Sequence, residues 1–241
     1  MPPNNLLRAL RPNDLGLLQS DLKPASVRMD QVLYHPGDEV RQVYFPLEAT
    51  VLAFRVVVDD GRAVETALIG REGAVAGVVS HGRLPAFSRI EVWHEGAVLR
   101  LDVERLEAAK AKSPSIRSLF ARYADCLMAQ VFQQVACNAA HSIEQRTAKW
   151  IVSTMERTSE AFVPYTQEQL AGALGVGRSY LNRVIQMLKA RGLIETHRGG
   201  LTVLDPTGIG ALACRCNPAV RRHFDEVLKG VYPEEASAAA E

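Results

Sequence analysis

The chain has 241 residues, of which 47% are hydrophobic and 23% charged, and its formal net charge is +1. This is the composition of a globular protein with one large or two modest domains, and so small a net charge indicates no particular partner. The purest apolar run, residues 74–79, is far shorter than the roughly 20 residues of a membrane-spanning helix, which excludes a membrane protein.

The N-terminal segment MPPNNLLRALRPNDLG lacks the basic and then apolar pattern of a secretory signal, so we expect a cytoplasmic protein. In that compartment free thiols are the default, and we expect them for all four cysteines. Leucines in the first 20 residues predict short helices that cap the following domain. These leucines are Leu6, Leu7, Leu10, Leu15 and Leu18.

The first half of the chain predicts β-structure. Segments such as QVLYHPGDEV, VYFPLEATVLAFRVVV and IEVWHEGAVLRLD are rich in Val, Tyr, Phe and Leu, and turn signals separate them. Asp60-Gly61 predicts a hairpin turn with positive φ at both central positions. Many short strands at this spacing favour a β jelly-roll barrel, which we assign to residues 1–112.

A long helix is predicted over residues 113–140. Ser113 and Pro114 suit the N-cap and the first helical position, and no Gly or Pro follows for about 26 residues, or roughly 40 Å of helix. Its apolar stripe either packs on the barrel or forms a parallel coiled-coil dimer, with Gln130 as a polar core residue. We favour the dimer, because the barrel alone cannot cover so long a stripe. The expected interface residues are Ile116, Leu119, Tyr123, Cys126, Leu127 and Gln130.

The remaining residues, 141–241, predict a DNA-binding domain. Ser142 and Gln145 match a capping box that starts one helix, and Thr166 is the expected N-cap of the next. In QEQLAGALGVGRSYLNRVIQMLKARG, Gly175 supplies the left-handed conformation that turns the chain between two short helices. The second of these helices, about 178–190, buries its apolar side and presents a polar side near its N-terminus. This is the pattern of a helix-turn-helix.

A wing and a local basic surplus strengthen this interpretation. The segment GLIETHRGGLTVLD predicts a hairpin around Arg198-Gly199-Gly200. Between residues 165 and 222 there are eight Lys and Arg against three Asp and Glu, a balance of 8 − 3 = +5 that attracts phosphate. The alternative is a structural helix pair with a solvated polar face. Arg178 and Arg183 on the exposed side of the second helix make DNA binding the better prediction.

The order of β-barrel, long helix and winged helix-turn-helix, an α+β fold, resembles the Crp/Fnr superfamily of dimeric transcription regulators. YHPGD and DDGR resemble its barrel turns, and YTQEQLAGALGVGRSYLNRVIQMLKARGLIE resembles its DNA-binding signature. The resemblance implies a cyclic-nucleotide-binding-type sensor, a coiled-coil dimer and a palindromic operator. The expected partners are double-stranded DNA, a second copy of the chain and RNA polymerase, with no membrane.

The resemblance also implies contacts with DNA. By motif position, Arg178, Ser179 and Arg183 correspond to base-reading residues, and Thr166, Gly177 and Tyr180 to backbone-contacting ones. Asn182 and the wing residue Arg198 complete the predicted DNA-binding set. Many members carry Glu where this chain has Ser179. A hydroxyl lacks the carboxylate's preference for cytosine N4, so the half-site need not be the commonest one.

The sensor half departs from the family pattern. Gly77 fits the phosphate cassette, but Val78 stands where the ribose-binding Glu is expected. Phe87-Ser88 replaces the Arg-Ser pair, and Arg89 comes one residue late, which on a strand turns it to the opposite face unless a bulge corrects the register. Gly77, Val78, Ser88 and Arg89 are the candidate effector pocket. We expect that the domain does not bind cAMP in the conventional way, and that it binds another small ligand, responds to another signal or has lost ligand control. A cyclic-nucleotide site shifted to Arg89 is the alternative.

The further interpretations are a metal or redox sensor, a haem sensor and an enzyme. Cys214-x-Cys216, with Cys137 in ACNAAH, could form a metal or redox site, but such sites usually need four ligands. Ordinary thiols and no metal site are therefore expected, with a reversible Cys214/Cys216 redox role as an alternative. A haem sensor is a further alternative, and His81 and His94 are the only histidines near the expected pocket that could bind the haem iron. A cupin-type enzyme is not expected, because no two histidines are spaced i,i+2 and no catalytic motif is present.

Overall fold

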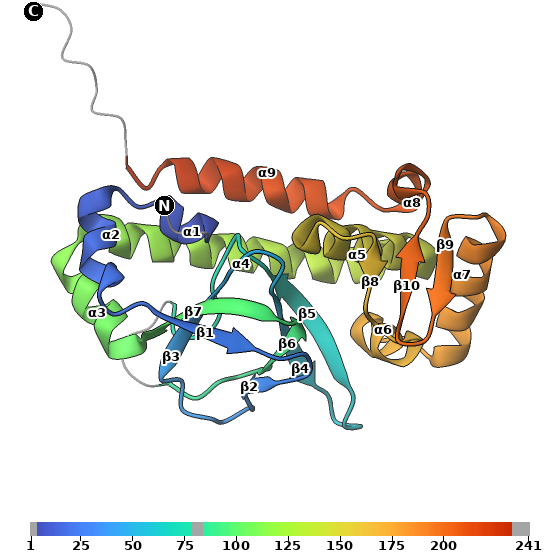
Figure 1. The fold of residues 1–241 in the computed structure, drawn as a ribbon, viewed down its shortest axis with the longest axis horizontal. Coiled ribbons are helices and arrows are strands. Elements are labelled where there is room, and N and C mark those ends of the chain that lie inside the picture. Colours follow the sequence, from blue (N-terminus) through green and yellow to red (C-terminus); the bar gives the residue numbers. More distant parts are fainter. Residues whose placement is uncertain (1–3, 79–83, 233–241) are drawn as a thin grey trace, which may run out of the picture.

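The computed structural model describes residues 4–78 and 84–232. A β-rich half and a half that carries the wing lie side by side, and the long helix α4 (Pro114–Ala140) spans both (Figure 1). The predicted α+β class is confirmed. Within the described residues, no helix combines the length and the apolar content needed to cross a membrane.

Two short helices, α1 (Asn5–Arg8) and α2 (Pro12–Gln19), begin the described chain, as predicted. The side-chain oxygen of Asn4 accepts a hydrogen bond from the Leu7 N–H at 3.1 Å, and Pro12 occupies the first turn of α2. Leu6, Leu7, Leu10 and Leu18 are buried against the β-rich half. Apolar side chains therefore hold this N-terminal cap in place.

Among the residues that the structure describes, seven strands of the β-rich half form two antiparallel sheets. One contains β1 (Lys23–Val27), β7 (Gly96–Asp102) and β3 (Gln42–Pro46), in that order. The other contains β2 (Val32–Tyr34), β6 (Arg89–His94), β4 (Val51–Val57) and β5 (Ala63–Ile69). Val43, Phe45, Leu52, Val92 and Leu101 belong to the core that these sheets share. In the described residues the sheets stay separate, so the domain is a sandwich and not a closed barrel.

The β4–β5 hairpin has a different turn from the predicted one. Val58 and Arg62 close the loop, and the Gly61 N–H donates to the Val58 carbonyl at 2.8 Å. Only Gly61 has a positive φ, of 81°, and Asp60 does not. The turn therefore follows the longer hairpin pattern in which one left-handed glycine follows two ordinary turn residues.

The long helix begins as predicted, and a further helix, α3 (Val103–Lys112), precedes it. The Ser113 hydroxyl accepts a hydrogen bond from the Ile116 N–H at 3.2 Å, and Pro114 lies in the first turn of α4. Lys110 of α3 is buried and donates to the Val78 carbonyl at 2.9 Å and to Glu107 at 2.8 Å. Helix α3 was not predicted, because it follows β7 without a loop.

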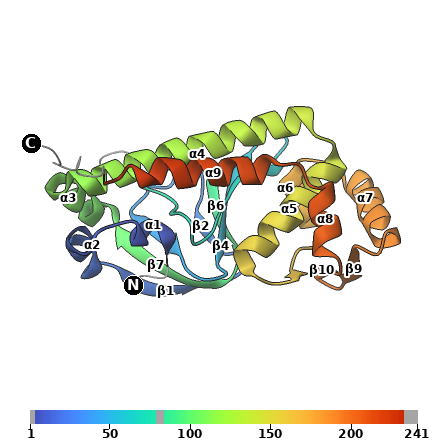
Figure 2. The ribbon, with the colours of Figure 1, turned by 90° about the horizontal axis from the view of Figure 1, so that it is seen from above.

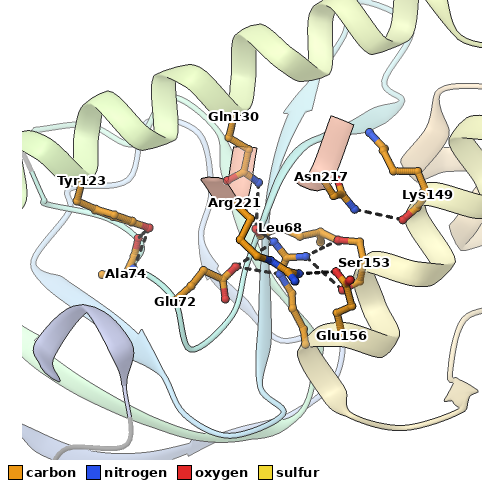
Figure 3. Close-up of polar contacts among 11 residues, drawn as sticks. Leu68, Glu72, Ala74, Tyr123, Gln130, Lys149, Ser153, Glu156, Asn217 and Arg221 are labelled. Atoms are coloured by element: carbon orange, nitrogen blue, oxygen red, sulfur yellow. Dashed lines mark hydrogen bonds and ion pairs between the residues drawn. The ribbon is translucent and has the colours of Figure 1, made fainter. Parts of the chain in front are cut away.

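The predicted dimer stripe of α4 is buried inside the chain, which corrects that prediction. Ile116, Leu119, Tyr123 and Cys126 belong to the sandwich core. The Tyr123 hydroxyl accepts from the Ala74 N–H at 2.9 Å and donates to the Ala74 carbonyl at 2.8 Å (Figure 3). Leu127 is half-buried against the same core. The four buried side chains are therefore unavailable to a partner chain.

A different stripe of α4 is exposed. Its large apolar side chains are Met128, Val131, Phe132 and Val135, and Phe132 and Val135 are 64% and 63% exposed. Ala121 and Ala139 extend the same three- and four-residue spacing and are also exposed. The helix thus has two apolar faces, one covered by its own chain and one open.

The C-terminal half begins with α5 (Ile143–Thr158), which starts at the predicted capping box of Ser142 and Gln145. There follow β8 (Phe162–Val163), α6 (Gln167–Leu174), α7 (Arg178–Ala190), β9 (Ile194–His197), β10 (Gly200–Val203) and α8 (Pro206–Leu212). The last helix, α9 (Cys216–Lys229), lies along α4 and returns toward the β-rich half (Figure 2). Neither α9 nor β8 was predicted from the sequence.

Two contacts fix α9. The Phe224 ring packs edge-on against Tyr123 of α4, with ring centroids 6.2 Å apart, and Arg122 Nη1 donates to the Val227 carbonyl at 2.9 Å. Beyond the helix, the Tyr232 hydroxyl donates to Asp14 of α2 at 2.6 Å. The end of the described chain is therefore attached to its beginning.

The two halves share a second hydrophobic core. Trp93 of β6 packs against Trp150 of α5 and against Tyr165, with ring centroids 5.5 and 5.0 Å apart. Trp150 Nε1 donates to Glu65 Oε2 at 2.9 Å. A bulge in β5 between Glu65 and Ala67 turns Glu65 toward this interface. The outer face of the four-stranded sheet therefore carries the C-terminal half.

Candidate nucleic-acid interface

The turn between α6 and α7 has the predicted geometry. The Thr166 hydroxyl accepts from the Gln169 N–H at 3.2 Å, and the Gln169 side chain accepts from the Thr166 N–H at 2.9 Å. At the end of α6, Gly175 has φ 65° and ψ 34°, and its N–H donates to Ala171 and Gly172 carbonyls. This left-handed residue sets the direction in which α7 leaves the turn.

Helix α7 has one buried and one exposed side. Leu181, Val184, Ile185 and Leu188 are at most 2% exposed and pack into the core of the C-terminal half. Every residue of the predicted DNA-binding set lies at the surface. These residues are Thr166, Gly177, Arg178, Ser179, Tyr180, Asn182, Arg183 and Arg198.

Weak interactions orient the two arginines of α7. Arg178 pairs with Glu168 of α6 at 3.5 Å, and both side chains are 71% exposed. The Arg183 guanidinium lies 5.2 Å from the centre of the Tyr180 ring, one helical turn earlier. Exposed contacts of this kind contribute about 1 kcal/mol or less. Both guanidiniums can therefore exchange these partners for a phosphate or a base edge at little cost.

The start of α7 offers backbone donors as well. Gly177 is the N-cap and no side chain caps the helix there, so the first N–H groups of this 13-residue helix face outward. The helix dipole adds positive potential at the same end. Together with Arg178, this end of α7 suits an anion such as a DNA phosphate.

The wing stands beside the helix pair (Figure 1). Strands β9 and β10 pair as predicted, and β8 adds a third strand on the other side of β10. Gly199 turns the hairpin with φ 88°, next to the exposed Arg198. A side chain at Gly200 would come within 2.5 Å of the Val163 carbonyl, so only glycine allows β8 to approach.

Thr166 and the wing adjoin each other. Thr166, Thr196 and Gly199 line one small hollow of about 130 Å³ between the helix pair and the hairpin. The fold thus brings the predicted DNA-binding set to one end of the molecule. The first and last members of this set, Thr166 and Arg198, are 198 − 166 = 32 positions apart in the sequence.

The candidate effector pocket does not form as a phosphate site. Arg89 lies on the outer face of the sheet, where its Nε is 2.8 Å from Glu91, while the next residue, Ile90, belongs to the sandwich core. Its inclusion in an interior pocket is therefore corrected, since no bulge moves it inward. Val78 is buried, and its carbonyl already accepts from Lys110. Ser88 is half-buried just before β6.

The remaining sensor residues lie as follows. Gly77 has φ 53°, and a Cβ there would come within 2.6 Å of Val103, so this chain needs the glycine for packing. His94 points to the C-terminal half, with Nε2 at 3.9 Å from Glu160. His81, the other haem candidate, lies outside the described residues.

A cleft of about 490 Å³ lies between the four-stranded sheet, α5 and α9, and the sequence analysis did not predict it. Arg157 Nε donates to Glu72 at 2.9 Å, and Arg221 Nη2 donates to Glu156 at 2.5 Å (Figure 3). Gln130, predicted to lie in a dimer seam, instead donates to the Leu68 carbonyl at 3.1 Å on this cleft's wall. These two ion pairs join α5 to the loop after β5 and to α9.

Glu65 also lines this cleft. It is buried, and burial raises the pKa of its carboxyl to about 7. The hydrogen bond from Trp150 and the positive charges of Lys149, Arg157 and Arg55 oppose the rise. A carboxyl that titrates near neutral pH therefore lies at the junction between the two halves.

Comparison with known proteins defines the class. Residues 145–212 match the model of the Crp-like helix-turn-helix domain. Among solved structures, a putative transcriptional regulator of the Crp/Fnr family from Eubacterium rectale is 18% identical, with a TM-score of 0.63, over 86% of this chain and 96% of that one. FixK2 from Bradyrhizobium japonicum is 15% identical, with a TM-score of 0.65, over 80% and 98%.

A CRP-family transcriptional regulator from Thermus thermophilus is 19% identical, with a TM-score of 0.66, over 78% of this chain and 95% of that one. At the level of sequence, no curated protein matches the chain. At these identities the solved structures establish the fold. The chain therefore has the fold of Crp/Fnr-family regulators and carries a Crp-like helix-turn-helix domain over residues 145–212, as its resemblance to that superfamily predicted.

Proposed function

We propose that the protein is a sequence-specific DNA-binding transcription regulator that acts as a homodimer on a palindromic operator. The single observation that carries the proposal is the exposed side of α7. Arg178, Ser179 and Arg183 are exposed there although the opposite side of the same helix is fully buried. A recognition helix needs this division, because its polar side must enter a major groove while its apolar side holds its angle.

The other surface features fit the same function. The free N–H groups of α7, Thr166 and the wing residue Arg198 are suited to the phosphates on either side of the groove. The open apolar stripe of Met128, Val131, Phe132 and Val135 supports the dimer, since a second copy of α4 can cover it in a coiled coil. Two α7 helices related by a twofold axis then read two inverted half-sites.

Selection from random genomic fragments tests the proposal. Fragments retained by the purified protein at moderate salt should share an inverted repeat whose half-sites are centred about 10 bp, or one helical turn, apart. Affinity should fall steeply as salt rises, because Lys and Arg release counterions from the phosphates. Retention of fragments with no enriched motif would reject sequence-specific binding.

Arg183→Ala should weaken binding to the selected operator by about 1–3 kcal/mol and relax the preference at one base position. The reason is that Arg183 lies on the exposed side of α7, one turn from Tyr180, where a guanidinium can reach a guanine edge. Competition assays with operators changed at single positions measure both effects. Arg222→Ala is the matched control, because Arg222 is an exposed arginine on α9. An equal affinity loss on every operator would make Arg183 a phosphate contact instead.

A further inference from the structure

Three cysteines and a histidine come together where α4 ends and α9 begins. Cys137 and His141 lie one turn apart at the end of α4, Cys214 lies between α8 and α9, and Cys216 is the first residue of α9. Their ligand atoms, three sulfurs and one ring nitrogen, all lie within 4.8 Å of one another. The sequence predicted separate thiols here, because it did not pair His141 with cysteines more than 70 residues away.

The distances suit a single tetrahedral ion. Cys137 Sγ and Cys214 Sγ are 3.6 Å apart, and Cys216 Sγ is 3.7 Å from His141 Nδ1. Zinc–sulfur bonds of about 2.3 Å at tetrahedral angles place two ligand sulfurs about 3.8 Å apart. A disulfide would need sulfurs at about 2.0 Å. An iron–sulfur cluster binds its ligands through different irons and so needs a wider shell.

The sulfurs are buried and have hydrogen-bond donors beside them. The three cysteines are at most 8% exposed and form a small cluster of their own. Lys149 Nζ lies 3.4 Å from Cys137 Sγ, and Gln133 Nε2 donates to Cys216 Sγ at 3.3 Å. Three thiolates, one neutral imidazole and a divalent ion leave one negative charge, which the buried Lys149 ammonium balances. Donors aimed at metal-bound sulfurs are the usual outer shell of such a site.

We propose that Cys137, His141, Cys214 and Cys216 bind one Zn²⁺ ion. Three thiolates and one imidazole are a structural zinc set, and four protein ligands leave no open position for a reacting molecule. The ion joins the end of the exposed α4 stripe to the segment between the wing and α9. If α7 reads DNA, as proposed above, zinc therefore fixes the position of the reading helix relative to the dimer seam. That consequence rests on the proposed function, whereas zinc binding does not.

Metal analysis and native mass spectrometry of the full chain, reconstituted with Zn²⁺, test the site without DNA. One ion per chain is expected. Reconstitution with Co²⁺ should give the intense visible bands of a tetrahedral complex and a sulfur-to-cobalt charge-transfer band in the near ultraviolet. Cys137→Ser, Cys214→Ser, Cys216→Ser and His141→Ala should each weaken zinc binding by at least about 100-fold. Cys126→Ser and His223→Ala are the matched controls and should bind as the wild type does.

A measurement on the wild type alone guards against variants that fail to fold. Zinc should protect Cys137, Cys214 and Cys216 from alkylation, read by peptide mass spectrometry, and leave the reactivity of Cys126 unchanged. The proposal is overturned by a wild-type chain that takes up neither ion, by an octahedral cobalt spectrum, or by a Cys137–Cys214 disulfide with the corresponding loss of two hydrogens. Operator affinity with and without zinc is then a separate measurement, so a failure of DNA binding leaves the zinc result standing.

Discussion

Phe132→Glu will convert the proposed dimer to a monomer and weaken its binding to the selected operator by about 100-fold or more. Phe132 is 64% exposed in the middle of the open stripe of α4. In a coiled coil this side chain would face its counterpart, and two carboxylates there would be buried together without a partner. A monomer then binds DNA with one recognition helix. It loses the gain in affinity from linking two binding sites, which is typically a factor of about 10²–10⁴.

Sedimentation velocity and fluorescence anisotropy on the operator measure the two effects. Phe87→Glu is the matched control, because Phe87 is 85% exposed and does not lie on α4. It should remain a dimer with unchanged affinity. A Phe132→Glu protein that still sediments as a dimer would show that another surface holds the two chains together.

Glu65→Gln should remove a pH dependence of stability that the wild type shows between about pH 4.5 and 7. Burial raises the pKa of Glu65 from 4.5 to about 7, so the folded protein holds a proton that the unfolded chain has lost in this range. The stability contributed by this group is fully present below pH 4.5 and is lost as the pH rises through about 7. The loss amounts to about 3 kcal/mol. Glutamine stays neutral and keeps an acceptor for Trp150.

Urea unfolding of both proteins from pH 5 to pH 8 measures this difference. Relative to the wild type, the free energy of unfolding of Glu65→Gln should rise as the pH increases to about 7 and then level off. Glu226→Gln is the control, since the side chain of Glu226 is 81% exposed. Its free energy of unfolding should show the same pH dependence as that of the wild type. Parallel curves for Glu65→Gln would mean that Glu65 is already ionised throughout this range.

Local structure could be predicted from the sequence wherever a few neighbouring residues determine it. The start of α4 at Ser113-Pro114, the two capping boxes and the turn at Gly175 are examples, and each is confirmed. Each depends on hydrogen bonds within about four residues, or on one φ angle. The Asp60-Gly61 hairpin lies at the predicted position but has a different turn type from the predicted one. The reason is that the number of loop residues depends on strand register.

Choices between distant partners could not be predicted. The sequence of α4 shows two apolar stripes but not which one meets the sandwich, and the buried one was assigned to the dimer. Phe224 and Val227 of α9 carry a helical spacing that could have revealed this helix, yet nothing local says that it lies on α4. Likewise, Cys137 and His141 form an i,i+4 pair that becomes a candidate site only when α8 and α9 bring two further cysteines to it.

The hydrogen bond between Tyr232 and Asp14 also has a consequence for the order in which the chain folds during its synthesis. These residues are 218 positions apart, and α9 can cover its side of α4 only after residues 216–229 have been made. Contacts this distant in sequence form late, since a long loop must close before they contribute any free energy. Until then Tyr123 lacks the Phe224 ring beside it and Cys137 lacks its partners from the later segment. A nascent chain thus completes its sandwich first. A chain whose synthesis stops before α9 has the α9-facing side of α4 exposed to solvent.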